Sequence, residues 1–157
     1  MHSNTEVLTR LFTALDRHDH DAMAACYAEN ASFRDIAFKL EGRTRIHAMW
    51  HMICDGDIKT TFKIDEVDER TAFVTVVDDY TFRAKGRKVH NVIQSRFRFK
   101  DGSIVQQQDS CDSRQWASMA IGGVGGFLAG RISLLRGAKA RRTLDTFIEK
   151  HPQYKES

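Results

Sequence analysis

Two aspartates in the sequence, Asp35 and Asp109, are candidates for acid–base chemistry. Asp35 ends a short predicted strand that leads into a loop, and Asp109 lies near the end of a later strand. A carboxylate in an apolar pocket is desolvated, so its pKa rises and it can exchange a proton near neutral pH. Two carboxylates in different surroundings can divide the roles of acid and base. The structural alternatives are that Asp35 braces its loop through backbone N–H groups and that Asp109 pairs with an arginine such as Arg96.

Other polar and aromatic side chains are predicted to share an inner surface with these aspartates. Tyr80 could donate a hydrogen bond to a substrate carbonyl, although a strand tyrosine more often packs with its hydroxyl at the rim. Cys111 has the strand parity of Asp109, and a lone cysteine usually packs as a small core residue. The predicted ligand-pocket residues are Trp50, Tyr80, Asn91, Ser95, Gln107 and Cys111.

Two histidine patterns raise the question of a metal site. Residues 18–21 read HDHD, and His47 and His51 are four residues apart, on one face of a predicted helix. Metal ligands must converge from fixed elements, and no glutamate completes an HExxH arrangement. We therefore expect Asp19 and Asp21 to be helix caps, the two later histidines to lie on a solvated face, and no metal to bind.

These residues are positioned by a predicted hairpin over residues 91–115. Apolar and polar residues alternate with a period of two before an Asp-Gly turn, which is a strong hairpin signal. Short connections to the preceding strands allow only an antiparallel meander. The predicted meander strands span 60–69, 71–84, 88–99 and 103–113; the predicted helices span 7–17, 22–27 and 44–52, and a short strand spans 31–38. Helices followed by a meander predict an α+β fold with a strongly curved antiparallel sheet.

The segment 116–135 is nearly all apolar. It nevertheless contains an arginine, two serines and five glycines, whereas a membrane span needs about 20 uninterrupted apolar residues. We therefore expect no membrane span. The segment is predicted to be a helix or helix pair packed on the sheet mouth or on a partner chain, and a break near 122–126 is equally compatible with its glycines. A last amphipathic helix is predicted over 141–150, with Leu144, Phe147 and Ile148 facing inward.

The composition is that of a globular protein with one core. The chain has 157 residues, 41% of them hydrophobic and 29% charged, and a single proline. A net charge of +3 is too small to indicate nucleic-acid binding. Three cysteines without CxxC spacing favour a reduced, cytoplasmic protein. The GGVGG run lacks the lysine of a phosphate-binding loop and the later acid of a dinucleotide fold, so no cofactor is expected.

Three stretches of the sequence resemble the nuclear transport factor 2-like superfamily in its SnoaL-like branch: FRDIAFKLEGRTRIHAMW, DDYTFRAKGRKVHN and FRFKDGSIVQQQDSCDSRQWASMAIGG. The resemblance covers about Val7 to Gly123. It implies a cone, in which a curved sheet wraps the N-terminal helices around an apolar pocket. We expect residues 1–115 to form this cone and residues 116–157 a helical, glycine-rich extension. The superfamily contains isomerases, cyclases, epoxide hydrolases, dehydratases and transport factors, so the fold alone does not give the function.

The resemblance also assigns roles to positions. Asp35 matches the general base of ketosteroid isomerases with this fold, but Ser95 stands where they carry an acid and Leu11 where they carry a tyrosine. Two of three positions depart, so steroid isomerisation by that mechanism is not expected. The Asp-Arg-Asp set of limonene epoxide hydrolases is not evident in HNVIQSRF. Asp109 is similar in role to an acidic residue of SnoaL-like cyclases.

Two functional hypotheses follow. The first is a cofactor-independent enzyme of isomerase, cyclase or hydrolase type acting on an apolar, carbonyl-bearing or polyketide-like molecule. The second is a ligand-binding or interaction module without chemistry. In both, the resemblance implies a homodimer formed through the convex face of the sheet.

Overall fold

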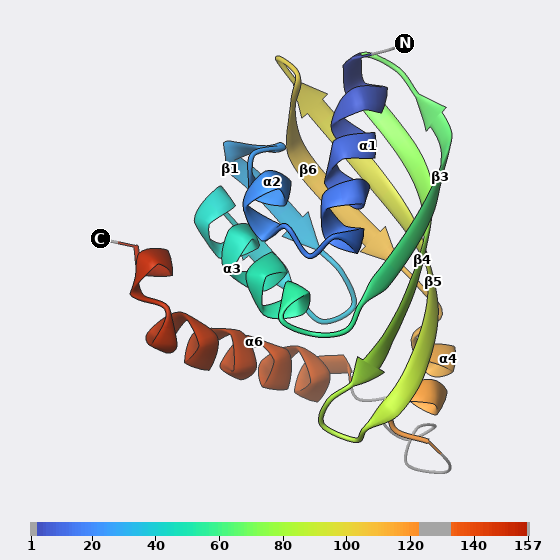
Figure 1. Ribbon diagram of the computed structural model, residues 1–157, viewed down its shortest axis with the longest axis vertical. Helices are drawn as coiled ribbons and strands as arrows, with labels where there is room; N and C mark the ends of the chain where they lie inside the picture. The colour runs from blue at the N-terminus through green and yellow to red at the C-terminus, as the bar shows by residue number, and fades with distance from the viewer. Residues whose placement is uncertain (1–2, 123–132, 157) are drawn as a thin grey trace.

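The computed structural model describes residues 3–122 and 133–156, and it has the α+β cone predicted from the sequence (Figure 1). The predicted glycine-rich segment lies largely outside the described residues. The elements are α1 (Ser3–Asp16), α2 (His20–Ala24), β1 (Tyr27–Arg34), β2 (Lys39–Glu41), α3 (Arg43–Cys54), β3 (Lys59–Val67), β4 (Thr71–Phe82), β5 (Arg87–Lys100), β6 (Ser103–Ser110), α4 (Ser113–Ala120), α6 (Ser133–Lys150) and the 3-10 turn η1 (Pro152–Tyr154).

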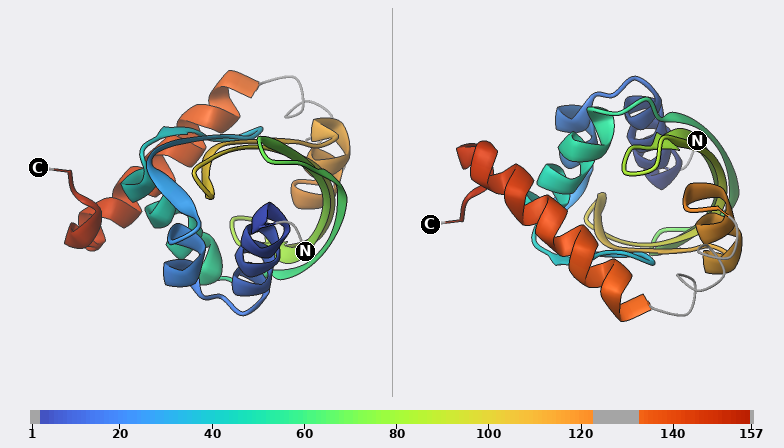
Figure 2. Two further views of the ribbon diagram at one scale, coloured as in Figure 1. Left: turned by 90° about the horizontal axis from the view of Figure 1, so that it is seen from above. Right: turned by 90° about the horizontal axis from the view of Figure 1, so that it is seen from below.

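The six strands form one sheet in the order β2-β1-β6-β5-β4-β3. Strands β3 to β6 are the predicted antiparallel meander. Strand β1 runs parallel to β6 and antiparallel to β2, which extends the sheet beyond the meander. The sheet curls partway around α1, as the two end views show (Figure 2).

One end of the cone is a packed apolar core around α1. Leu8 and Leu11 are fully buried, and the Phe12 ring stacks on Phe62 at 5.2 Å and meets Phe97 edge-on at 6.0 Å. Within α1 the buried residues Leu8, Leu11 and Leu15 recur every three or four positions. One face of the helix is therefore apolar, and it packs into the curl of the sheet.

The C-terminal helix α6 packs on α3 of the same chain (Figure 1). Leu144 is fully buried, Ile148 is nearly so, and Phe147 packs against them, as predicted. All three contact the core cluster of the cone, although the predicted boundary at residue 115 stays a prediction. Among the described residues, no helix combines the length and hydrophobicity needed to cross a bilayer.

Some predicted boundaries were wrong, each for a local reason. Tyr27 was assigned to a helix, but it begins β1 because its side chain is buried against β6. The strand predicted over 31–38 ends at Arg34, because Asp35 forms a turn into β2. The last strand ends at Ser110, since Asp112 caps α4 by accepting from the backbone N–H groups of the next turn. Helix α4 then ends before Gly122, whose φ of +82° favours glycine.

Candidate functional site

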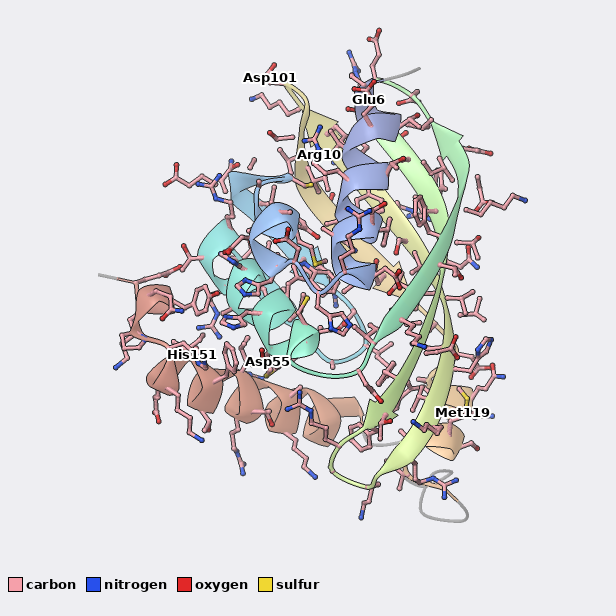
Figure 3. All side chains as sticks on the ribbon, in the orientation of Figure 1. Glu6, Arg10, Asp55, Asp101, Met119 and His151 are labelled. Atoms are coloured by element: carbon pink, nitrogen blue, oxygen red, sulfur yellow. The ribbon has the colours of Figure 1, made fainter. Side chains whose placement is uncertain are left out.

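The inner face of β5 is apolar near one end of the strand and polar toward the other. Phe97 and Phe99 are buried near the β5–β6 turn, whereas Ser95 and Asn91 are buried nearer to the α4 end. Figure 3 marks the two ends of the molecule, with Asp101 at the turn and α4 at the other end. The polar candidate residues therefore gather in the half of the cone close to α4.

The centre of this polar half is Asp109 on β6. Its register partner on the adjacent strand β5 is Ser95, whose hydroxyl donates a hydrogen bond to Asp109 Oδ1 at 2.6 Å. Gln107 lies two residues earlier on the same face, and its Nε2 donates to Oδ1 at 3.1 Å. Asp109 is half-buried, while Ser95 and Gln107 are 2% and 1% exposed, so the two donors are fixed by packing.

A hydrogen-bonded chain holds Gln107 in its orientation. The Tyr27 hydroxyl donates to Gln107 Oε1, and Trp50 Nε1 donates to the Tyr27 oxygen at 3.1 Å. Because the amide oxygen is occupied by Tyr27, the amide nitrogen points at Asp109. Trp50 thus acts on the site through Tyr27. The sequence analysis missed Tyr27, since no local signal links it to a glutamine 80 residues away.

The pKa of Asp109 is raised from 3.8 to about 7, chiefly by burial and in smaller part by the charges of Asp35 and Asp78. The hydrogen bonds from Ser95 and Gln107 act in the opposite direction, because they stabilise the ionised form. Near neutral pH both protonation states of Asp109 are populated, which is the condition for a general acid or base.

Asp35 braces the turn between β1 and β2. Its Oδ1 accepts from the backbone N–H groups of Ala37 at 2.8 Å and Phe38 at 2.6 Å, which is the loop-bracing alternative considered from the sequence. Its charge nevertheless acts on the site, because it raises the pKa of both Asp109 and Tyr80. Arg96, the structural partner considered for Asp109, instead lies over the Phe73 ring on the other face of the sheet.

Tyr80 and Asp78 extend the polar half along β4. The Tyr80 hydroxyl accepts from Trp116 Nε1 at 2.6 Å, and burial raises its pKa to about 12, so the phenol keeps its proton. Asp78 is 8% exposed, accepts from Thr60 Oγ1 at 2.8 Å, and has its pKa raised to about 6 by burial. The sequence analysis missed Asp78, although its parity with the buried Val74 and Val76 places it on the inner face.

Asn91 lies directly across from Asp78 in the β4–β5 register. Asn91 is 8% exposed, and its side-chain amide makes no hydrogen bond to any of residues 3–122 or 133–156. A buried amide without a partner costs free energy unless a ligand completes it. Cys111 is half-buried, and its charge raises the pKa of Tyr80, so it lies at the same end of the cone.

Two surface pockets lie outside this network, and Asp109 lines neither. A pocket of about 380 Å³ beside α4 is lined by Tyr80, Val89 and Met119 among others. A pocket of about 390 Å³ lies on the opposite flank, over α2 and α3. Tyr80 is therefore the member of the polar half that lines a surface pocket, while Asp109 itself is half-buried.

The histidine residues depart from their predicted roles. Asp19 caps α2 as expected, with Oδ1 accepting from Ala22 N at 3.0 Å. Asp21 is not a cap: its Oδ1 lies 3.1 Å from His47 Nε2. The side chains of His47 and His51 are 22% and 17% exposed, so the solvated face predicted for them was wrong. Packing of α2 and η1 on α3 covers this face.

The comparisons with known proteins agree with this architecture. Residues 8–107 match the family model of the SnoaL-like domain. No protein of curated function matches the sequence significantly. Many solved structures match the fold, and the three described next, which are 14–18% identical to this chain, establish the fold alone.

Three similar structures illustrate the range. An epoxide hydrolase resembling limonene epoxide hydrolase, from M. tuberculosis, is 18% identical with a TM-score of 0.62, over 85% of this chain and 95% of that one. A putative polyketide cyclase from Silicibacter sp. TM1040 is 18% identical with a TM-score of 0.66, over 73% and 92%. A protein with a ketosteroid isomerase-like fold from Catenulispora acidiphila, in complex with trimethylamine, is 14% identical with a TM-score of 0.65, over 73% and 92%.

The match to the family model spans well over half of the sequence and includes Ser95 and Gln107. The six-stranded curled sheet reproduces the fold of the solved neighbours. The chain therefore belongs to the SnoaL-like domain family and has the nuclear transport factor 2-like cone fold.

Proposed function

We propose that the chain is an acid–base enzyme acting on a small apolar molecule, with Asp109 as the residue that transfers the proton. The observation that carries the proposal is the Asp109 carboxyl, half-buried, held by Ser95 and Gln107, and shifted in pKa to about 7. General acid–base catalysis by a positioned group of this kind contributes about 10²–10⁴-fold in rate.

In the proposed reaction, ionised Asp109 takes a proton from a carbon next to a substrate carbonyl and returns it to another atom. Tyr80 keeps its phenolic proton, so it is the proposed hydrogen-bond donor to the carbonyl oxygen. Asp35 is the proposed second acid–base residue, and its charge adds to the rise in the Asp109 pKa that burial chiefly causes. A proton transfer between these groups needs no cofactor.

The proposed substrate class is apolar and carbonyl-bearing, with polyketide-like compounds as the first candidates. The cone interior presents aromatic and aliphatic walls beside a few polar groups, which suits such molecules. Structural neighbours of similar fold include a putative polyketide cyclase and an epoxide hydrolase/cyclase-like enzyme that acts in pyran ring formation in salinomycin. The Tyr80 side of the cone is the proposed entry, because Tyr80 lines a surface pocket.

The second candidate is a ligand-binding module without turnover. The observation that favours it is Asp35, whose Oδ1 already accepts two backbone N–H groups and so braces a turn. In that case the side-chain amide of Asn91 would form hydrogen bonds to a bound molecule, and this molecule would be released without chemical change.

We further propose a homodimer formed through the convex face of the sheet and a reducing, cytoplasmic location. The dimer proposal is supported by Phe73 and Val92, which are 39% and 46% exposed. The location is supported by Cys26 and Cys54, which are buried free thiols. Sedimentation of the purified chain tests the dimer, and a monomer at micromolar concentration would contradict it.

The function is tested with a panel of apolar ketones and polyketide-like compounds, followed by deuterium exchange at carbons next to the carbonyl. The Asp109→Asn variant should lose exchange while its circular dichroism remains native. Asp65→Asn is the matched control, because Asp65 is exposed on β3 and lines neither surface pocket. Exchange that persists in Asp109→Asn would overturn the catalytic proposal, and a ligand recovered unchanged with undiminished affinity would favour the binding module.

A further inference from the structure

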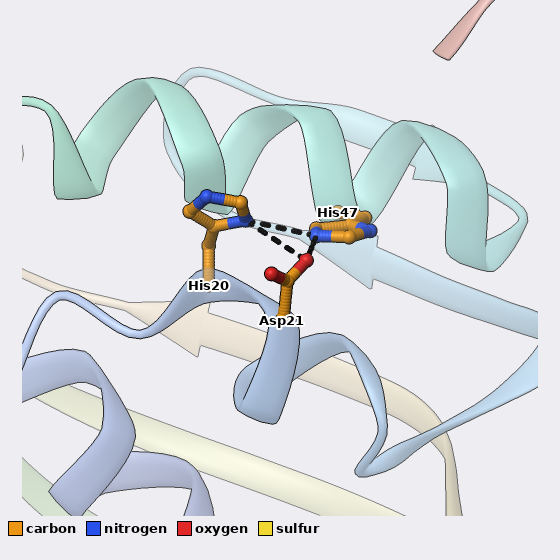
Figure 4. Close-up of side chains that lie close together, drawn as sticks. All are labelled: His20, Asp21 and His47. Carbon is orange, nitrogen blue, oxygen red and sulfur yellow. Dashed lines mark hydrogen bonds and ion pairs between the residues drawn. The ribbon is translucent and has the colours of Figure 1, made fainter. Parts of the chain in front are cut away.

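Three side chains from α2 and α3 converge on one point at the flank of the cone (Figure 4). The three atoms are His20 Nδ1, Asp21 Oδ1 and His47 Nε2. The two nitrogens are 2.9 Å apart, Asp21 Oδ1 is 3.1 Å from His47 Nε2, and it is 3.5 Å from His20 Nδ1. Helices α2 and α3 pack on each other, so the atoms converge from fixed elements.

One proton can serve at most two of the three edges of this triangle. Each atom acts either as a donor or as an acceptor at a given moment, so two of the three always share a role. If both histidines donate to Asp21, two N–H groups face each other at 2.9 Å. If His47 alone donates, its N–H is shared between Asp21 Oδ1 and His20 Nδ1, and these two acceptors then face each other at 3.5 Å. A cation at the centre removes the conflict, because all three atoms then present lone pairs to it.

The dimensions also fit a metal ion. Zinc binds histidine nitrogen and carboxylate oxygen at about 2.0–2.2 Å, so neighbouring ligand atoms in a tetrahedron are about 3.3–3.5 Å apart. The observed edges of 2.9, 3.1 and 3.5 Å reach this spacing with small side-chain shifts. Two imidazoles and one carboxylate suit zinc and its first-row neighbours better than magnesium or calcium, which prefer oxygen ligands.

The surroundings hold the two imidazole rings in place. The His51 ring stacks on His20 at 3.8 Å, and the Tyr154 ring meets His47 edge-on at 5.0 Å. The Tyr154 hydroxyl in turn contacts His51 Nδ1 at 2.8 Å. Tyr154 belongs to η1. His151, the residue just before η1, has its ring 5.0 Å from the His51 ring. Figure 3 shows His151 near Asp55 at the end of α3.

The three atoms also line a pocket of about 390 Å³ together with Arg43, Thr44, Gln153 and Tyr154. A bound ion would therefore keep open coordination positions toward this pocket, available to water or an exogenous ligand.

We propose that His20, Asp21 and His47 form a binding site for a divalent transition-metal ion of the zinc type. This site is separate from Asp109, because it lies on α2 and α3 outside the sheet's inner face, and it does not rest on the proposed acid–base function. The proposal replaces the expectation from the sequence that Asp21 is a cap and His47 a solvated residue. A bound ion would link α2 to α3 and so raise the melting temperature of the fold.

The experiment uses the full chain stripped of metal with a chelator. Calorimetric titration with zinc should show one ion bound per chain, and cobalt should bind at the same site with visible d–d absorption that zinc abolishes. His20→Gln, Asp21→Asn and His47→Gln should each weaken zinc binding at least tenfold. His90→Gln is the matched control, because His90 Nδ1 also faces a carboxylate, Asp79 Oδ1 at 2.7 Å. The His90→Gln variant should bind zinc as tightly as the wild type does.

Asp21 is 80% exposed, so Asp21→Asn should retain the native circular dichroism and keeps the test decisive if a histidine variant fails to fold. The proposal is overturned if no stoichiometric binding occurs, if Asp21→Asn binds zinc as tightly as the wild type, or if His90→Gln weakens binding equally. Competition by millimolar magnesium as effective as that by cobalt would also overturn it, because the site would then be selecting oxygen-preferring ions.

Discussion

The raised pKa of Asp109 makes the stability of the protein depend on pH in a way that one substitution isolates. Folding raises this pKa from 3.8 to about 7, chiefly by burial, so the folded chain binds the proton more tightly than the unfolded chain does. The resulting stabilisation is fully present below the unfolded pKa and is lost as the pH rises through the folded pKa. The Asp109→Asn variant lacks this titration and should lose the corresponding part of the pH dependence.

The magnitude follows from the size of the shift. One pKa unit corresponds to about 1.4 kcal/mol, so the complete loss of stabilisation is about 4 kcal/mol. About 3 kcal/mol of it falls between pH values of about 5 and about 8. Asp78, whose pKa is raised to about 6, adds its own pH dependence to both proteins, so only the part that arises from its interaction with the Asp109 charge remains in the difference.

The assay is urea unfolding followed by tryptophan fluorescence at several pH values between these limits. The stability advantage of Asp109→Asn over the wild type should grow by about 3 kcal/mol from about pH 5 to about pH 8. Asp57→Asn is the control, since hydrogen bonds from Thr81 lower the pKa of exposed Asp57 and its stabilising effect disappears only at more acidic pH. Parallel curves for the wild type and Asp109→Asn would refute the reasoning, and with it the proton-transfer role of Asp109.

Three further substitutions test the network. Ser95→Ala removes a donor to ionised Asp109, so the carboxyl pKa should rise by about one unit, measured by NMR titration; an unchanged pKa would show that the hydrogen bond is unimportant. Tyr27→Phe leaves the buried oxygen of Gln107 without its donor and should cost about 1–3 kcal/mol in urea unfolding, and a neutral effect would contradict this. Asn91→Leu removes a buried amide that has no partner among the described residues; it should raise stability by about 1 kcal/mol and weaken ligand binding, and destabilisation would argue against it.

Strand periodicity made part of the site predictable. The alternation in β5 placed Asn91 and Ser95 on the inner face, and both are buried there. The same parity in β4 places Asp78 on the inner face with Val74 and Val76, and it is buried there. The cross-strand pairing of Ser95 with Asp109 could not be predicted from periodicity. It depends on an irregularity in the β5–β6 register between Arg98 and Phe99.

Local signals were misleading where the tertiary partner is distant in sequence. Tyr27 follows an alanine-rich segment that favours a helix, yet its role depends on Gln107, with which it pairs across 80 positions. Asp21 resembles a helix cap because it follows the capping residue Asp19, and only the packing of α2 against α3 brings it to His47.

The sequence by itself determined the α+β class, the antiparallel meander and the inward side of its strands, because these follow from local periodicity and short connections. Tertiary structure alone decided which polar groups meet. The pKa of Asp109 depends on burial and on the charge of Asp35 from another turn, and the meeting of His20 with His47 depends on two helices packing together. Such properties arise from distances between residues far apart in the chain, which a pattern of neighbouring residues does not encode.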